Sequence, residues 1–280
     1  MAADFTTRAS ITGHARIVVI LAHPVGHLRT PAAMNAHFAA TNRDAVLVPM
    51  HVLPEDLPAA VDGLRRIRNL GGIVVTVPHK ETIARLCDRL TGQARMVGAV
   101  NAIRREADGT LLGGQFDGEG FVAGLRAAGH AVAGRRVWMA GAGGAAAGIG
   151  FALLQHGVAM LGVHNRGAAR AAALVTRLRA AYPGAGIAAA GPDPAGFDIV
   201  VNATSLGLEP EDALPVDPAL LRPAMLAAEV VMQPEVTRFL AAASAIGCAT
   251  HQGLPMLTEQ VPILADFVTA QHWAEHSTRA

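Results

Sequence analysis

Short apolar runs alternate with helical segments along the first part of the chain. Three apolar runs have the length and composition of buried β-strands, at residues 16–22, 46–52 and 72–78. A segment with helical spacing follows each run, at residues 31–40, 54–67 and 79–87. Because strands joined by helices pair in parallel, this alternation predicts a mostly parallel sheet covered by helices.

A second alternation begins near residue 117 and continues towards the end of the chain. We expect helices at residues 117–129, 149–157, 168–181, 236–247 and 255–273, the last despite Pro262. We expect strands at residues 135–140, 159–165, 186–190, 197–204 and 226–232. The chain has 280 residues, and domains average about 150 residues. Two such alternations therefore predict two α/β domains.

Composition narrows the class of protein. Hydrophobic residues make up 51% of the chain, which excludes a disordered protein. Lys and Arg number 23 against 22 Asp and Glu, so no net charge attracts nucleic acid or an anionic membrane. Two cysteines, Cys87 and Cys248, are too few for a disulfide framework and indicate a reduced, cytoplasmic protein. The segment 1–10 carries charges and no apolar core, so we expect no signal peptide.

One stretch imitates a membrane span. No charged residue occurs from Val137 to Gln155, a length that a spanning helix could use. The stretch contains Gly141, Gly144 and Gly148, and glycine is a poor residue for the centre of a helix. A strand followed by a glycine turn explains the pattern better.

The glycine turn has the spacing of a dinucleotide site. The apolar strand Val-Trp-Met-Ala leads into Gly-Ala-Gly-Gly-Ala-Ala, which fits the pattern G-x-G-x-x-G/A between a strand and a helix. Glycine is needed where a Cβ would block the pyrophosphate, which takes hydrogen bonds from N–H groups at the start of the helix. We therefore predict cofactor contacts at Gly141, Gly143, Gly144 and Ala145. The alternative is a glycine-rich turn between packed elements.

The residues after the next strand indicate which dinucleotide binds. An NAD site usually has Asp or Glu here for the ribose 2′-hydroxyl, whereas this chain has Asn165 and Arg166, with Arg170 four residues on. A guanidinium binds a 2′-phosphate that a carboxylate would repel. NADP is therefore expected rather than NAD, and both arginines share a face if the segment is helical. The alternative is that both arginines are only solvated.

Three further strings carry polar groups suited to hydride-transfer chemistry, at residues 75–80, 98–103 and 113–121. Oxidation of an alcohol requires a group that takes the proton of the hydroxyl. Lys80, just after a strand, and Asp117, at a domain junction, can form such an acid–base pair. Taken singly, each residue has a simpler interpretation, Lys80 as a surface lysine and Asp117 as the N-cap of the following helix.

Together these strings resemble the shikimate/quinate dehydrogenase family, and the resemblance runs from the first strand to the last helix. Val-Thr-Val-Pro-His-Lys is similar to the family's N-V-T-x-P-x-K, which implies that Thr76 binds substrate and Lys80 is catalytic. Gly-Ala-Val-Asn-Ala is similar to G-A-V-N-T and implies that Asn101 binds substrate. Gln-Phe-Asp-Gly is similar to N-T-D-G and implies that Asp117 is the catalytic aspartate.

Further motifs extend the resemblance into the second half of the chain. His-Asn-Arg-Gly is similar to the family's N-R-T motif for NADP. Residues 198–208 resemble D-x-I-I-N-A-T-S-x-G, which implies that Asn202 and Thr204 lie near the cofactor. The segment from Gln252 resembles G-L-G-M-L-x-x-Q, which implies that Gly253 lies near the nicotinamide and Gln260 on the substrate.

The resemblance implies a fold and an activity. It implies a substrate-binding domain at residues 1–116, completed by a returning C-terminal helix within 253–280, and a Rossmann-type NADP-binding domain at 117–252. It also implies reversible hydride transfer between NADP(H) and a ring hydroxyl or ketone, as in shikimate and 3-dehydroshikimate. We expect a cytoplasmic monomer or homodimer that takes part in aromatic amino acid biosynthesis.

The chain departs from the family pattern where the substrate carboxylate is expected. The family's H-S-L-S-P reads His-Leu-Arg-Thr-Pro here, so one serine is Leu28 and the other is Thr30. The other departures make the pocket more apolar, at Val74, Phe116 and Met232. Losing two hydrogen bonds to a carboxylate costs about 3–6 kcal/mol, or roughly two to four decades in affinity, of which Arg29 recovers a part if it points inward. The alternative substrate is therefore a less polar cyclic compound.

Two other hypotheses remain open. His23 and His27 are four residues apart, but the proline and glycine between them disfavour a helix, so we expect no metal site. A substrate loop that has lost polar groups also fits a non-catalytic, NADP-binding regulatory protein, although such a protein would not need Lys80 and Asp117.

Overall fold

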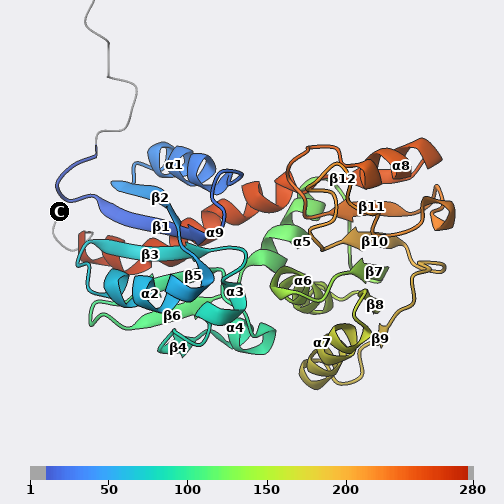
Figure 1. The fold of residues 1–280 in the computed structure, drawn as a ribbon, viewed down its shortest axis with the longest axis horizontal. Coiled ribbons are helices and arrows are strands. Elements are labelled where there is room, and N and C mark those ends of the chain that lie inside the picture. The colour runs from blue at the N-terminus through green and yellow to red at the C-terminus, as the bar shows by residue number, and fades with distance from the viewer. Residues whose placement is uncertain (1–10, 277–280) are drawn as a thin grey trace, which may run out of the picture. The chain divides into compact units, whose positions relative to one another are not determined.

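The computed structural model describes residues 11–276, with side chains to residue 270. The expectation of no signal peptide concerns residues 1–10 and lies outside the described residues. Two compact units form: unit 1 contains the described residues up to Gln115 and from Val261 onward, and unit 2 is Phe116–Gln260. The division inside the last helix falls after Gln260, later than the expected boundary at residue 252. Each unit is an α/β structure (Figure 1).

Unit 1 is built on a six-stranded sheet with the order β2-β1-β3-β5-β6-β4. Its strands are β1 (Arg16–Ala22), β2 (Ala45–His51), β3 (Leu70–Val75), β4 (Arg89–Leu90), β5 (Ala102–Arg105) and β6 (Leu111–Gly114). The expected strands β1, β2 and β3 pair in parallel, whereas β5 is antiparallel to both of its neighbours. The strands β4, β5 and β6 were not predicted from the sequence, because each has four residues or fewer.

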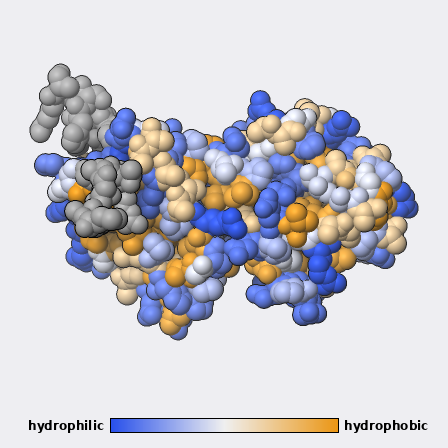
Figure 2. All heavy atoms as spheres, turned by 90° about the horizontal axis from the view of Figure 1, so that it is seen from above, coloured by the Kyte–Doolittle hydropathy of each residue, from blue (hydrophilic) through white to orange (hydrophobic). Residues whose placement is uncertain are grey.

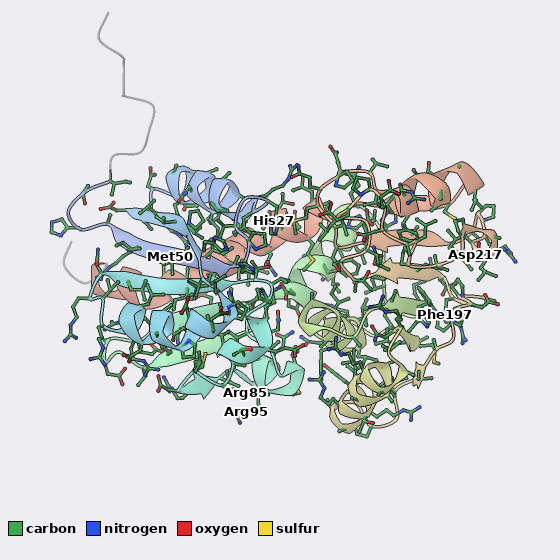
Figure 3. The ribbon with its side chains drawn as sticks, in the orientation of Figure 1. His27, Met50, Arg85, Arg95, Phe197 and Asp217 are labelled. Atoms are coloured by element: carbon green, nitrogen blue, oxygen red, sulfur yellow. The ribbon has the colours of Figure 1, made fainter. Side chains whose placement is uncertain are left out.

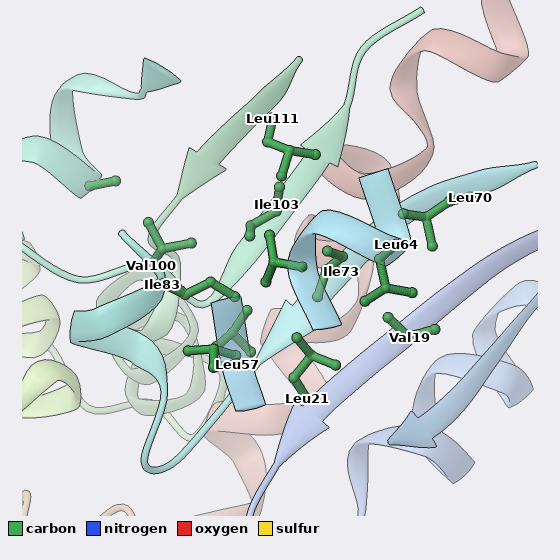
Figure 4. Packing of buried hydrophobic residues seen from close by; sticks show 13 residues of the cluster. Val19, Leu21, Leu57, Leu64, Leu70, Ile73, Ile83, Val100, Ile103 and Leu111 are labelled. Carbon is green, nitrogen blue, oxygen red and sulfur yellow. The ribbon is translucent and has the colours of Figure 1, made fainter. Parts of the chain in front are cut away.

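Helices cover both faces of this sheet. They are α1 (Thr30–Ala40), the short 3-10 helix η1 (Pro54–Asp56), α2 (Leu57–Arg65), α3 (Lys80–Ile83), α4 (Gly92–Val97) and the later part of α9 (Leu254–His276). Leu57 and Leu64 of α2 lie in one buried cluster with Leu21 and Ile73 of the sheet (Figure 4). Since side chains alternate along a strand, Gly72 faces the other way, where an added Cβ would lie 2.7 Å from the Cβ of Val268 on α9.

Unit 2 is built on a six-stranded, fully parallel sheet with the order β12-β11-β10-β7-β8-β9. Its strands are β7 (Arg136–Ala140), β8 (Met160–His164), β9 (Ile187–Ala189), β10 (Ile199–Asn202), β11 (Leu226–Glu229) and β12 (Ala249–His251). The chain runs outward from β7 to β9 and then returns to the other side of β7 with β10. The strand order therefore reverses between β7 and β10, where open α/β sheets bind ligands at their carboxyl edge.

The remaining elements of unit 2 are α5 (Asp117–Ala127), α6 (Gly144–Gln155), α7 (Ala168–Ala181), η2 (Pro218–Leu220) and α8 (Arg238–Ile246). Trp138 of β7 and Phe239 of α8 lie together in one buried cluster. No helix within residues 11–276 is long and apolar enough to cross a membrane. The charge-free stretch 137–155 instead contains most of β7 and all of α6.

Surface polarity is mixed. Figure 2 shows polar and apolar residues interspersed over one face. The edge strand β2 exposes two apolar side chains, Val48 and Met50, of which Met50 is labelled in Figure 3.

Candidate functional site

Lys80 is the first residue of α3, which follows the carboxyl end of β3 in unit 1. The N–H of Val100 donates to the carbonyl oxygen of Lys80 at 2.8 Å. The preceding residue, His79, is 1% exposed, and its Nε2 lies 2.9 Å from the carbonyl oxygen of Val52. Burial lowers the pKa of His79, so its neutral ring donates this hydrogen bond. These contacts fix the backbone that carries the half-buried Lys80 side chain.

Thr76 and Asn101 lie at the same edge of the sheet as Lys80. Thr76 directly follows β3, and its N–H donates to a carbonyl oxygen of β1 at 3.1 Å. Asn101 bridges two strands, because it accepts from the N–H of Val75 at 2.8 Å and donates from its own N–H to Gly114 at 3.0 Å. Its side chain is only 2% exposed. Since β5 runs antiparallel to β3, it starts beside the carboxyl end of β3, which brings Asn101 to this edge.

The loop after β1 leads to the same edge. Figure 3 labels His27 in this loop. Thr30 is the half-buried first residue of α1, and Leu28 is half-buried two residues earlier. Arg29 occupies the N-cap position and is exposed. Unit 1 therefore gathers Thr30, Thr76, Lys80 and Asn101 at the carboxyl edge of β1 and β3.

In unit 2, Asp117 is the first residue of α5 and is 2% exposed. Phe116 holds the N-cap position, so the expectation of an N-cap role for Asp117 is wrong. Oδ1 of Asp117 accepts a hydrogen bond from Nε2 of Gln260 on α9 at 3.3 Å. Both side chains are buried, so this hydrogen bond orients a carboxylate that is largely removed from water.

Glycines of α5 allow α9 to come this close. A Cβ at Gly120 would lie 2.7 Å from the Cβ of Gln260, and a Cβ at Gly124 would lie 3.0 Å from the main chain of α9. A Cβ at Gly118 would clash with the carbonyl oxygen of Gly148 on α6. Because no side chain fits at these positions, α5 packs against both helices at backbone distance. The Asp-Gly motif thus has a packing reason as well as a chemical one.

The glycine turn after β7 combines a packing constraint with an open position. Gly141 has a φ of 121°, and an added Cβ would lie 2.7 Å from the carbonyl oxygen of Ala203. Gly143 is exposed, and a Cβ there would meet no atom within 4 Å. Helix α6 begins at Gly144, earlier than expected, so the N–H groups of Gly144 and Ala145 have no acceptor within the helix. Packing explains Gly141 but not Gly143, and the open space beside helical N–H donors fits a pyrophosphate.

The residues after β8 present positive charge. Nδ2 of Asn165 donates to the carbonyl oxygen of Gly167 at 3.0 Å and so shapes the turn. Gly167 is the N-cap of α7, so Arg166 precedes the helix, and the helical segment that would give Arg166 and Arg170 a shared face begins only after Gly167. The N–H of Arg170 donates to Gly167 at 3.0 Å, which places it in the first turn of α7. Both arginines are exposed and flank the same turn, an arrangement that fits a phosphate group.

Asn202 and Gly253 hold the chain at the ends of β10 and β12. Asn202 is fully buried and donates from Nδ2 to Leu206 at 2.8 Å, while its Oδ1 accepts from the hydroxyl of Thr204 at 2.6 Å. Its side chain thus supports the loop from within. A Cβ at Gly253 would clash with the carbonyl oxygen of Val231, so glycine is required where the segments after β11 and β12 meet.

Histidines do not form a metal site in the part of the chain whose side chains are described. No group of three or more His, Cys, Asp or Glu side chains there is arranged to hold a metal ion. His23 pairs with His51 rather than with its sequence neighbour His27. The two rings stack with centroids 4.9 Å apart, and Nδ1 of His23 lies 2.7 Å from Nε2 of His51.

His251 gives unit 2 a dependence on pH. It is 4% exposed beside the rings of Phe121 and His130, and burial lowers its pKa from 6.5 to about 4. The folded chain therefore excludes a proton that the unfolded chain binds below pH 6.5. We expect the contribution of His251 to the free energy of unfolding to fall by about 3 kcal/mol as the pH drops from 6.5 to 4, since each pKa unit is worth ~1.4 kcal/mol. The buried Glu229, whose pKa is raised, contributes with the opposite sign. Urea unfolding at several pH values measures this slope.

The matched variants are His251→Phe, which keeps a ring without a titrating group, and His27→Phe in the exposed loop. The first is expected to lose less free energy of unfolding between pH 6.5 and 4 than the unmodified chain, because the His251 contribution is gone. The second is expected to have the slope of the unmodified chain. Equal slopes in both variants would contradict the assignment.

Comparisons with known proteins show which protein family the chain belongs to. Residues 20–103 match the family model described as the shikimate dehydrogenase substrate binding domain. A relative from Rubrobacter xylanophilus, named shikimate dehydrogenase (NADP(+)), is 42% identical over 267 residues, which cover 93% of this chain and 91% of the relative. The chain belongs to the shikimate dehydrogenase family.

Solved structures of proteins similar in sequence share the fold. Shikimate 5-dehydrogenase from Thermus thermophilus, in complex with NADP(H) and shikimate, has a TM-score of 0.81 and 30% identity, with 91% of this chain and 94% of that chain covered. The 5-ketofructose reductase of a Gluconobacter species has a TM-score of 0.80 and 32% identity, with 92% and 97% covered. The family resemblance and the α/β fold class predicted from the sequence are confirmed.

Among the shikimate dehydrogenase motifs, the lysine has a property that the sequence analysis overlooked. Lys and Arg together number 23, and Lys80 is the only lysine of the chain. Arginine keeps its proton in proteins, whereas lysine can release one. A chain that uses arginine at every other such position therefore retains lysine at the position of the family's catalytic lysine. Counting lysines in the sequence could have strengthened the assignment.

Proposed function

We propose that the chain is an NADP-dependent dehydrogenase that oxidises a ring hydroxyl and reduces the corresponding ketone, with shikimate and 3-dehydroshikimate as the leading pair. The observation that carries the proposal is the sole lysine, Lys80, at the catalytic position of the family motif. The buried pair of Asp117 and Gln260 supports it, because a dehydrogenase needs an oriented acid–base group. The name of the Rubrobacter relative, shikimate dehydrogenase (NADP(+)), supports the same activity.

The residues that we assign to the cofactor lie in unit 2. We assign the pyrophosphate to the N–H groups at Gly143, Gly144 and Ala145, and the 2′-phosphate to Arg166 and Arg170. When bound, NADP accepts the hydride and NADPH donates it. The two exposed guanidinium groups favour NADP over NAD, because each can pair with a phosphate that NAD lacks.

Residues of this chain accept and return the proton of the substrate hydroxyl. Lys80 takes the proton of the substrate hydroxyl during oxidation and returns it during reduction. Asp117, the second acid–base residue that the family motif implies, offers a buried carboxylate that can accept a hydrogen bond from a substrate hydroxyl. Gln260 keeps the Asp117 carboxylate in one orientation through its hydrogen bond at 3.3 Å.

The substrate residues support two candidate classes. Thr30, Thr76 and Asn101 offer hydroxyl and amide groups for a polyol, and Arg29 can pair with an anionic group. Leu28 replaces a serine of the family's carboxylate loop, which favours a second candidate, a cyclic substrate without a carboxylate. The similarity to a 5-ketofructose reductase supports this second class, because that name denotes a sugar ketone.

Steady-state rates on a substrate panel separate the two classes. The leading proposal predicts kcat/KM for shikimate of ~10⁴ M⁻¹s⁻¹ or more with NADP. The second candidate predicts a lower value for shikimate and quinate than for a carboxylate-free cyclic alcohol. Binding of NADP without oxidation of any alcohol in the panel would refute both candidates and support a regulatory protein.

The variant Leu28→Ser tests the same point. Returning one hydrogen bond to a carboxylate adds at least about 1.5 kcal/mol, so KM for shikimate should fall roughly tenfold. Rates on carboxylate-free alcohols should not change. Leu53→Ser, at an exposed leucine, is the matched control and should leave both values unchanged.

The same proposal covers location and assembly. We propose a cytoplasmic enzyme, which is supported by the free thiols of Cys87 and Cys248. A monomer or homodimer stays a prediction, which light scattering of the purified chain would test.

A further inference from the structure

A buried carboxyl group lies at the carboxyl edge of the sheet in unit 2. Glu229 is the last residue of β11 and is 0% exposed. In the strand register it pairs with Asn202, the last residue of β10, which in turn pairs with Ala140 at the end of β7. The glycine turn begins at the next residue, Gly141. Glu229 is therefore two strands from the turn that we assign to the cofactor.

Two uncharged side chains hold the carboxyl group. The hydroxyl of Thr237 donates to Oε2 of Glu229 at 2.9 Å, and Nδ2 of Asn202 approaches the same oxygen at 3.5 Å. Thr237 is itself 1% exposed, and it is the N-cap of α8, where its hydroxyl accepts from the N–H of Leu240 at 3.3 Å. Oε1 of Glu229 has no hydrogen-bond partner in the described chain. The carboxyl group thus joins β10 to the start of α8.

The loop after β10 depends on the same side chains. Besides Glu229, Asn202 binds both ends of the turn that follows, as its Nδ2 donates to Leu206 and its Oδ1 accepts from Thr204. Gly207 has a φ of 106°, and an added Cβ would lie 3.2 Å from Cγ2 of Thr237. Asn202 therefore forms hydrogen bonds to residues 203–208, and Thr237 lies beside Gly207 of the same loop. Glu229 accepts hydrogen bonds from both Asn202 and Thr237.

This loop touches the glycine turn. A Cβ added at Gly141 would lie only 2.7 Å from the carbonyl oxygen of Ala203. The N–H of Ala203 donates to the carbonyl oxygen of Ala140 at 2.8 Å. A shift of the loop would therefore displace the turn or open a gap beside it.

We infer that Glu229 is a positioning residue that holds the loop 203–208 against the glycine turn and thereby sets the affinity for the dinucleotide. The inference rests on the proposed function in naming NADP as the ligand. Glu229 does not touch the ligand; it acts through Asn202 and Thr237.

The charge state of Glu229 supplies an independent readout. Burial raises its pKa from 4.5 to about 7, and the hydrogen bonds from Thr237 and Asn202 oppose the rise. On β12, the neighbouring strand, His251 packs beside Phe121 and His130. We therefore expect Glu229 to ionise near neutral pH, and an ionised carboxylate disfavours an anionic dinucleotide nearby.

Calorimetric titration of the full chain with NADP tests the inference without any turnover. Glu229→Ala removes the acceptor of both hydrogen bonds and is expected to raise Kd about tenfold. Glu229→Gln keeps an acceptor oxygen and should bind within about twofold of the unmodified chain at pH 6. Glu106→Gln is the matched control, since Glu106 is a buried glutamate of unit 1 that also has one unpartnered oxygen. It should leave Kd unchanged.

The pH series distinguishes positioning from a general loss of structure. Between pH 6 and 8, Kd of the unmodified chain and of Glu106→Gln should rise about threefold more than Kd of Glu229→Gln, because only the first two ionise at position 229. Titration of NADP itself is common to all three proteins and cancels. Unchanged affinity in a folded Glu229→Ala, or the same pH dependence in Glu229→Gln and the unmodified chain, would overturn the inference. Failure of the unmodified chain to bind NADP would instead refute the proposed function, and the inference with it.

Discussion

Replacement of Lys80 by arginine is expected to lower kcat about 10³-fold, because general acid–base groups contribute roughly 10²–10⁴-fold to a rate. Arginine keeps the positive charge but does not release its proton at neutral pH. The Kd for NADP should stay within about twofold, since the variant keeps the charge at position 80 and changes none of the assigned cofactor residues. Initial rates with saturating substrate, together with calorimetric NADP binding, measure both values. An unchanged kcat would contradict the role of Lys80.

The composition of the chain permits a chemical version of this test. Lys80 is the only lysine, so an amine-directed reagent can modify only this side chain and the α-amino group. Loss of activity should follow modification of the peptide that contains Lys80, and the substrate should protect both. The Lys80→Arg variant is the control, because only its α-amino group reacts. Full activity after complete modification of Lys80 would contradict the assignment.

Replacement of both Arg166 and Arg170 by alanine is expected to lower kcat/KM for NADP by about 10²–10³-fold. Each hydrogen bond to a charged group is worth roughly 1.5–3 kcal/mol, and tenfold corresponds to ~1.4 kcal/mol. The value for NAD should change less than about twofold, because NAD has no 2′-phosphate to lose contact with. Rates with each cofactor at saturating substrate measure this selectivity.

Arg177→Ala is the matched control for this pair. Arg177 is an exposed arginine of the same helix, α7, farther from the turn after β8. It should leave both cofactor values unchanged. Equal losses with NADP and NAD in the double variant would show that the arginines support the fold of the turn rather than recognise a phosphate.

Helices and strands with strong local patterns could be predicted from the sequence. The helix α7 was predicted with its observed bounds, because apolar residues recur at helical spacing and form its buried face, at Ala171, Leu174, Val175 and Leu178. The strand β1 was also predicted with its observed bounds. The helical period of α7 determines which of its faces is buried, whereas β1 is a continuous apolar run whose last five residues are all buried.

Elements that depend on distant contacts could not be predicted in this way. The helix α3 ends at Ile83, although helical residues continue to 87, because Asp88 pairs with Arg65 at 2.8 Å and accepts from the N–H of Leu111 at 2.7 Å. These contacts draw the chain into β4. The strand β12 has three residues, and its pairing with β11 rather than its composition makes it a strand.

The candidate site divides in the same way. Motifs identified the chemical groups, because a short pattern such as Val-Thr-Val-Pro-His-Lys carries its residue types locally. The contact of Asp117 with Gln260 joins positions 143 residues apart and depends on close helix packing at Gly120. The burial of Glu229 beside Thr237 likewise follows from the strand order, which no local pattern contains.

Hydride transfer in a single turnover tests the central claim most directly. The enzyme, in excess over shikimate and saturated with NADP, is mixed rapidly, and the absorbance of the reduced nicotinamide is followed. We expect the unmodified chain to form NADPH. We expect Lys80→Arg to bind NADP equally well but to transfer hydride about 10³-fold more slowly. The same rate constant in both proteins would contradict this expectation.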